Sequence, residues 1–226
     1  MKKQVFILTL LLFFGVGLYA QPKVVGEPRV IAKTSEPLQK PLWSADGKTL
    51  SFNNGQWEVS HDGTSLKKVT VATDAKRKPS ANALLQKMIA DPAKVASQVE
   101  GLKSLSGCIL FNATLSPKGD QIVFQASYGK GLFVCNADGS GLRSLGQGSR
   151  ATWTSDGKFI VAGKTEDDGH EITKGELVSI SVADGAQSIL LSSDKYIALS
   201  PTISPDGKKL AFEEYASGAI YVIDIQ

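Results

Sequence analysis

A ten-residue pattern that occurs four times limits what this chain can fold into more than any other feature. Each copy begins with a large apolar residue, turns at a glycine four positions later and ends in a short apolar strand. In the last copy, Ser204-Pro205-Asp206-Gly207 is a tight-turn sequence, because Pro205 presets φ and Gly207 accepts a left-handed conformation. The copies are Trp43–Phe52, Leu115–Phe124, Trp153–Ala162 and Ile203–Phe212.

A second turn follows a further apolar strand in three of the four copies. These turns are Asp62-Gly63, Asp138-Gly139 and Asp184-Gly185, and short apolar runs come after them. The order strand, turn, strand, loop, strand, turn, strand describes a four-stranded antiparallel blade, and an array of such blades forms a β-propeller. We therefore predict an all-β fold, a small β-propeller with four clear blades and room for a fifth.

The two ends of the repeat array predict how the ring closes. The fourth copy stops near Gln226, where its outer strand is still due, while residues 29–32 form an apolar run that belongs to no copy. Ile31 lies 12 residues before Trp43, as Leu191 lies 12 before Ile203. We expect residues 29–32 to be the N-terminal strand that closes the last blade.

The spacing of the repeat glycines points to an insertion between the first two copies. The repeat glycines are Gly47, Gly119, Gly157 and Gly207, and the gaps between successive ones are 72, 38 and 50 residues, whereas a blade takes about 40–45. The long gap holds a degenerate fifth blade or an insertion. Helical spacing of apolar residues favours a helical insertion at about 74–105, which packs on its own propeller or serves as a docking surface or lid.

The repeat pattern resembles a known family. W-S-P-D-G-x-x-I-A-F with a later D-G turn is similar to the WD40-like repeats of TolB-type periplasmic β-propellers, over residues 41–70 and 112–226. The resemblance implies a scaffold that binds partners in the periplasm, although the separate N-terminal α/β domain of full TolB proteins has no counterpart here. Related propellers include oligosaccharide lyases and the regulatory propellers of serine peptidases.

The first residues have the features of a secretory signal. Lys2 and Lys3 precede an apolar run, Val5 to Leu18, and Ala20 fits a cleavage site. We expect a signal peptide at 1–20 and a single β-propeller domain at 21–226, periplasmic or secreted, without stable membrane insertion after cleavage. An uncleaved anchor is the alternative. Removal of the two lysines lowers the formal net charge from +3 to +1, which gives no electrostatic case for nucleic acid as a partner.

Residues for catalysis are scarce in the sequence. There is no G-x-S-x-G, C-x-x-C or H-E-x-x-H motif, and the only histidines are His61 and His170. We expect no enzyme activity, no cofactor and no metal. Cys108 and Cys135 fall in one repeat unit, where they form a disulfide or, as we favour, two small apolar side chains.

The most polar cluster gives the candidate binding residues. It lies in a long loop of the third unit, and the corresponding loop of the fourth unit adds two carboxylates that would stand on the same rim. The cluster lacks the D-x-D-x-D-G spacing of a calcium loop. The predicted rim residues are Glu166, Asp167, Asp168, His170, Glu171, Glu213 and Glu214.

The sequence favours a non-enzymatic exported propeller that acts as a protein-binding scaffold or accessory subunit in the cell envelope. Its partner is expected to be another envelope or periplasmic protein. The alternative is a carbohydrate-binding or oligosaccharide-lyase-like propeller. The oligomeric state, including two short chains that share one larger ring, stays open at this point.

Overall fold

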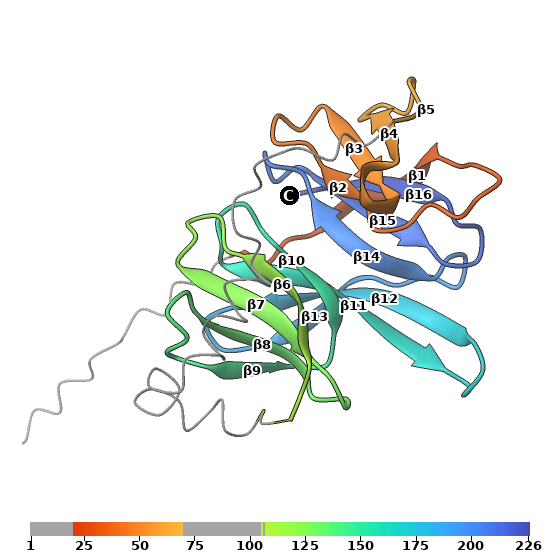
Figure 1. Cartoon of the computed structure of the whole chain (residues 1–226). Coiled ribbons are helices and arrows are strands. Elements are labelled where there is room, and N and C mark those ends of the chain that lie inside the picture. Colours follow the sequence, from red (N-terminus) through yellow and green to blue (C-terminus); the bar gives the residue numbers. More distant parts are fainter. Residues whose placement is uncertain (1–19, 70–104, 106) are drawn as a thin grey trace, which may run out of the picture.

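The computed structural model describes residues 20–69, 105 and 107–226 of the chain. They form four antiparallel sheets of four strands each, arranged as the blades of a propeller (Figure 1). The predicted all-β propeller with four clear blades is confirmed. The described residues contain no α-helix, and the helical insertion predicted at about 74–105 is not supported, because all of it but Leu105 lies outside the described residues.

Each blade follows the strand order predicted from the repeats, from an inner strand to an outer one. Blade 1 also contains a short 3₁₀ turn, η1 (Asn53–Gly55), after its second strand. Blade 1 comprises β2 (Leu42–Trp43), β3 (Thr49–Phe52), β4 (Trp57–Ser60) and β5 (Lys67–Lys68). Blade 2 comprises β6 (Leu110–Leu115), β7 (Gln121–Ala126), β8 (Gly131–Asn136) and β9 (Arg143–Gly146). Blade 3 comprises β10 (Ser149–Trp153), β11 (Phe159–Asp167), β12 (Ile172–Ser181) and β13 (Gln187–Leu191). Blade 4 comprises β14 (Ala198–Ile203), β15 (Lys209–Glu214), β16 (Ile220–Ile225) and β1 (Val24–Ala32).

The predicted closure of the last blade is confirmed, and the closing strand is longer than residues 29–32. β1 pairs antiparallel with β16, from Val24 opposite Ile225 to Ala32 opposite Ile220. Beyond the strand, the Lys23 N–H donates to the Gln226 carbonyl over 2.8 Å, and the Gln226 N–H donates back over 3.0 Å. Residues from the two ends of the described chain therefore share one sheet.

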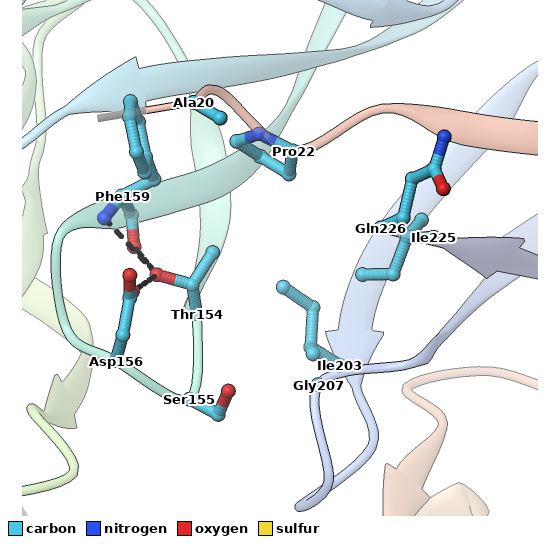
Figure 2. A pocket seen from close by; sticks show the side chains of 10 residues that line it. All are labelled: Ala20, Pro22, Thr154, Ser155, Asp156, Phe159, Ile203, Gly207, Ile225 and Gln226. Carbon is cyan, nitrogen blue, oxygen red and sulfur yellow. Dashed lines mark hydrogen bonds between the residues drawn. The ribbon is translucent and has the colours of Figure 1, made fainter. Parts of the chain in front are cut away.

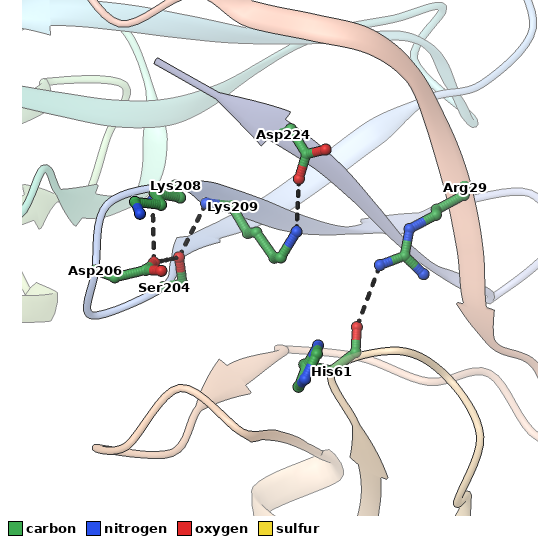
Figure 3. Close-up of polar contacts among 7 residues, drawn as sticks. All are labelled: Arg29, His61, Ser204, Asp206, Lys208, Lys209 and Asp224. Atoms are coloured by element: carbon green, nitrogen blue, oxygen red, sulfur yellow. Dashed lines mark hydrogen bonds and ion pairs between the residues drawn. The ribbon is translucent and has the colours of Figure 1, made fainter.

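The turn between the first two strands of each blade is held by one hydroxyl. In blade 4, Ser204 Oγ donates to Asp206 Oδ1 over 2.6 Å and accepts the Lys209 N–H over 2.9 Å (Figure 3). Blade 2 keeps the hydroxyl but moves the carboxylate past the glycine, so that Ser116 Oγ donates to Asp120 Oδ1 over 2.7 Å. The hydroxyl, of a serine in blades 1, 2 and 4 and of Thr154 in blade 3, is thus the constant part of this turn.

Successive blades are joined at these turns and at the tryptophans that open two repeats. A Cβ on Gly207 would lie 2.4 Å from Ser155 Oγ of blade 3, which shows how closely the turns pack. The Trp153 indole N–H donates to the Thr114 carbonyl of blade 2 over 3.1 Å, and that of Trp43 donates to the Thr202 carbonyl of blade 4 over 3.2 Å. Both indoles therefore pack between blades.

Blade 1 differs from the others on the face that points away from blade 4. At one repeat position blade 2 pairs Val123 with Val134, both fully buried, whereas blade 1 pairs Ser51 with Glu58. Glu58 also lies 3.7 Å from the Lys67 ammonium. Among the described residues, apolar clusters join blades 2 to 3, 3 to 4 and 4 to 1, but none joins blade 1 to blade 2.

The two cysteines are free thiols. Cys135 lies in the core of blade 2, and Cys108 packs against the border of that core. Cys135 is buried, and burial raises the pKa of its thiol to about 11, with the charge of Asp138 adding to the effect. Cys108 is half-buried beside the same cluster. The favoured interpretation of two small apolar side chains is confirmed for Cys135.

The closing strand makes a stability prediction. Ile31 is buried in the cluster between blades 4 and 1, while its neighbour Val30 is 50% exposed. Ile31→Ala should lower the free energy of unfolding by about 2–4 kcal/mol, because it removes buried methyl groups and leaves a cavity. Urea denaturation measures this loss, and Val30→Ala on the opposite face of the strand is the matched control. Equal losses in the two variants would contradict an integral β1.

The blade 4 turn makes a pH prediction. Hydrogen bonds from the Ser204 hydroxyl and then the Lys208 N–H hold the pKa of Asp206 below its ordinary value of 3.8. A carboxyl with a lowered folded-state pKa contributes stability above its unfolded pKa and loses it as the pH falls through the folded one. The difference in unfolding free energy between the wild type and Asp206→Asn should therefore shrink from pH 6 down to about pH 2. A constant difference across that range would be the opposite result.

Candidate functional site

The acidic loop predicted as a binding rim is a hairpin that extends beyond blade 3 (Figure 1). Asp168 Oδ1 accepts the N–H groups of Glu171 and His170, each over 2.9 Å, and these bonds lower the pKa of its carboxyl. Asp167 accepts the Gly169 N–H over 3.0 Å. The two aspartates therefore shape the hairpin turn themselves.

Glu213 and Glu214 are not loop residues, because they are the last two residues of β15 and are buried. Burial acts to raise the pKa of Glu214, but hydrogen bonds from Ser217, Ala216 and Ile197 outweigh it and lower the pKa. Glu213 Oε2 accepts the backbone N–H of Lys40 in blade 1 over 2.7 Å. Both carboxylates hold backbone in place.

The structure brings three of the seven predicted residues to one hollow. Glu171, Glu213 and Glu214 line a space of about 580 Å³ between the blade 3 hairpin and blade 4. Glu166, Asp167, Asp168 and His170 lie elsewhere on the hairpin, where Glu166 faces the Lys174 ammonium over 3.9 Å. Within residues 20–69, 105 and 107–226, no three His, Cys, Asp or Glu side chains gather as a metal site.

A different feature lies where the four inner strands begin. All four repeats have a non-glycine residue with a left-handed backbone at the same position, three residues before the large apolar residue that opens the repeat. These residues are Lys40 (φ 53°), Asn112 (φ 51°), Arg150 (φ 49°) and Ser200 (φ 49°). The pairing registers of β6, β10 and β14 shift at these positions, which marks a β-bulge in each strand.

These bulges surround a shared hollow that we call the mouth. It has a volume of about 210 Å³ and lies at the end of the propeller opposite the Asp-Gly turns. The position after each left-handed residue is small, which leaves the space open. The mouth is lined by Lys40–Leu42, Asn112–Thr114, Arg150–Thr152 and Ser200–Thr202.

The polar groups of the mouth are cations and neutral hydrogen-bonding groups. Lys40 and Arg150 are exposed, and neither takes part in an ion pair among the described residues. The Asn112 amide donates to Gln125 Oε1 over 3.1 Å. Ser200 is only 6% exposed, and its hydroxyl has no hydrogen-bond partner in the described part of the chain.

A second hollow, at the opposite end, has no such unpartnered group. It holds about 180 Å³ between blades 3 and 4, beneath Ala20 and Pro22 (Figure 2). Thr154 Oγ1 lies in it, but donates to Asp156 Oδ1 over 2.6 Å and accepts the Phe159 N–H over 3.0 Å. Its hydroxyl is occupied by the turn, so the mouth is the better candidate for a binding site.

The three residues before each repeat are a sequence signal for the mouth. The residues before the four repeats are Lys40-Pro41-Leu42, Asn112-Ala113-Thr114, Arg150-Ala151-Thr152 and Ser200-Pro201-Thr202. Extending each copy by three residues shows a polar residue followed by proline or alanine every time. The left-handed conformation itself has no sequence signature, because only glycine strongly indicates it.

Comparison with solved structures shows a likeness to β-propellers. TolB from Agrobacterium tumefaciens is 19% identical, with a TM-score of 0.42, over 86% of this chain and 60% of that one. Oligogalacturonate lyase from Vibrio parahaemolyticus is 14% identical, with a TM-score of 0.38, over 87% and 51% of the two chains. The β-propeller domain of Cps50 (Swd1) from Myceliophteria thermophila is 10% identical, with a TM-score of 0.40, over 84% and 54%.

The chain thus spans between about half and 60% of the length of these structures. No family model matches the sequence, and no curated protein matches it. Among the described residues, no helix is both long and apolar enough to cross a membrane. The role of the mouth is therefore argued from its own residues.

The left-handed residues make a prediction about strain. Arg150→Ala and Arg150→Gly both remove the exposed side chain, but only glycine adopts a positive φ without steric cost. The glycine variant should be more stable than the alanine variant by about 1 kcal/mol. Urea denaturation of the pair measures the difference, and an alanine variant as stable as the glycine variant would show that the bulge carries no strain.

Proposed function

We propose that this chain is an exported, non-enzymatic propeller that binds another protein in the cell envelope through the mouth. The observation that carries the proposal is the repetition of a left-handed, non-glycine residue at one position of all four inner strands. Such residues cost free energy and persist where the surrounding structure and the function require them. Their repetition around one hollow supports a recognition site.

The size of the mouth suits a protein segment better than an enclosed substrate. Pockets that take up a small molecule measure about 300–1,000 Å³, whereas the mouth holds about 210 Å³. A shallow hollow of this size receives one or two side chains of a partner, and the rim around it supplies further contact. Exposed tyrosines lie in the loops at the same end of the blades, Tyr128 after β7 at 80% and Tyr215 after β15 at 46% exposure.

The chemistry of the mouth is that of binding. Lys40 and Arg150 are its basic side chains and Asn112 and Ser200 are neutral, and the lining contains no carboxylate or imidazole that could serve as a general base. Catalysis of elimination or hydrolysis needs such a base at the reacting atoms. The same donors are well suited to hold a partner in a fixed orientation.

The alternative of a carbohydrate-binding or lyase-like propeller has less support in the described residues. Its base or metal ligands would come from histidines, and the two present are far apart in the blade architecture. His61 lies at the end with the Asp-Gly turns, where its backbone N–H donates to the Lys48 carbonyl over 2.9 Å. His170 lies on the blade 3 hairpin at the other end.

Site-directed photo-cross-linking tests the proposed function. A benzophenone amino acid replaces Tyr128 or Tyr215 at the mouth end, and Lys118 in an exposed turn at the opposite end is the matched control. In the native envelope, the two mouth positions should give an adduct of one defined mass that Lys118 does not give. Adducts from Lys118 alone, or no adduct from either tyrosine position, would contradict a protein-binding mouth.

A further inference from the structure

The Ser200 hydroxyl is the polar group of the mouth that most needs a ligand. Ser200 lines the mouth and is 94% buried. Its hydroxyl oxygen is buried too and has no hydrogen-bond partner among the described residues. A buried hydroxyl without a partner destabilises a fold, and most such groups are paired. Ser200 also stands in a left-handed backbone, with φ at 49°. Two unfavourable features therefore coincide at one residue.

The charges beside Ser200 define what the ligand would be. Lys40 belongs to blade 1 and Arg150 to blade 3, so they flank blade 4, which carries Ser200. None of the ion pairs between described residues uses either cation. Glu213 stands nearby, but its Oε2 already accepts the backbone N–H of Lys40 over 2.7 Å, and Glu213 is only 9% exposed.

Two cations and an unpartnered donor around one small hollow fit an anion with planar oxygens. Arginine binds carboxylates through two parallel hydrogen bonds, and lysine adds a point charge. A hydroxyl donates one hydrogen bond, and the buried hydroxyl of Ser200 donates none to a described residue. The small residues Pro41, Ala151 and Pro201 leave room beside these groups.

We propose that the mouth binds a carboxylate of the partner protein, with Ser200 Oγ and Arg150 donating to its oxygens and Lys40 supplying charge. The carboxylate belongs to an extended protein segment, as an acidic side chain or a free C-terminus. This inference rests on the proposed function, because it names the chemistry of the partner that the mouth receives.

Short peptides and nuclear magnetic resonance titrations test it on the full chain. The probes are acetyl-Ala-Ala-Glu-Ala-Ala-amide, which carries a side-chain carboxylate, and acetyl-pentaalanine with a free C-terminus. The glutamine analogue of the first probe is the neutral control, and trigalacturonate supplies a carboxylate on a carbohydrate. At least one of the two carboxylate peptides should bind at millimolar concentration and shift the signals of Arg150 and Ser200, and the glutamine analogue should bind at least about tenfold more weakly.

Variants assign the binding to the named groups. Ser200→Ala and Arg150→Gln should each weaken peptide binding about tenfold, the ratio expected for a lost charge-assisted hydrogen bond. Lys118→Gln, which removes an exposed cation at the opposite end, should leave it unchanged. Ser200→Ala should also keep or raise the melting temperature, because it removes a hydroxyl that has no partner. It therefore remains informative if Arg150→Gln fails to fold.

Several results would overturn the inference. These are equal binding of the glutamate and glutamine peptides, full binding by both variants, binding of trigalacturonate alone, or no binding by any carboxylate probe. The cross-linking experiment separates this failure from failure of the proposed function. If Tyr128 and Tyr215 still give their adduct, the mouth binds a protein through other chemistry, and only the carboxylate is wrong.

Discussion

The pairing of β1 with β16 is the interaction on which the rest of the structure depends. Blade 4 has only three strands from the end of the chain, and its outer edge is completed by Val24–Ala32. Ile31 and Ala32 then reach the cluster that joins blade 4 to blade 1. One strand thus completes the fourth sheet and fixes the place of the first blade.

The same packing fixes the mouth. Trp43 and Trp153 hold the inner strands of blades 1 and 3 to the preceding blades through their indole N–H groups. Three positions before these indoles stand the left-handed residues, Arg150 on β10 and Lys40 just before β2. A strand clamped by a buried indole at one end has little freedom to relax a strained residue at the other. The blades therefore position the mouth and maintain its conformation.

Most of the fold could be predicted from the sequence because its signals are local. Turn residues, apolar strands and the repeat period identified the four blades, and the leftover run near Ile31 identified the closing strand. The polar face of blade 1 was also readable, since Ser51 and Glu58 replace the valines that blade 2 has at the same positions. The insertion at about 74–105 lies outside the described residues and stays a prediction without support here.

The candidate site was harder to predict because charge is a poor guide to exposure. Glu213 and Glu214 resemble loop residues in sequence, yet the structure uses both as buried acceptors for backbone N–H groups. Asp167 and Asp168 form a turn. The mouth was missed because its strain depends on the bulges in β6, β10 and β14, and the buried, unpartnered hydroxyl of Ser200 becomes visible only when that residue is placed among its described neighbours. Local patterns specified the blades, and tertiary packing specified the site.

Hydrogen–deuterium exchange with the cross-linked partner bound tests the central claim most directly, because it reports on every described strand at once. We expect the partner to slow exchange at the starts of β6, β10 and β14 and at residues 39–43. The Asp-Gly turns at the opposite end should exchange as in the free protein. Slower exchange at those turns, or along the outer strands alone, would show that the partner binds elsewhere and would contradict the assignment of the mouth.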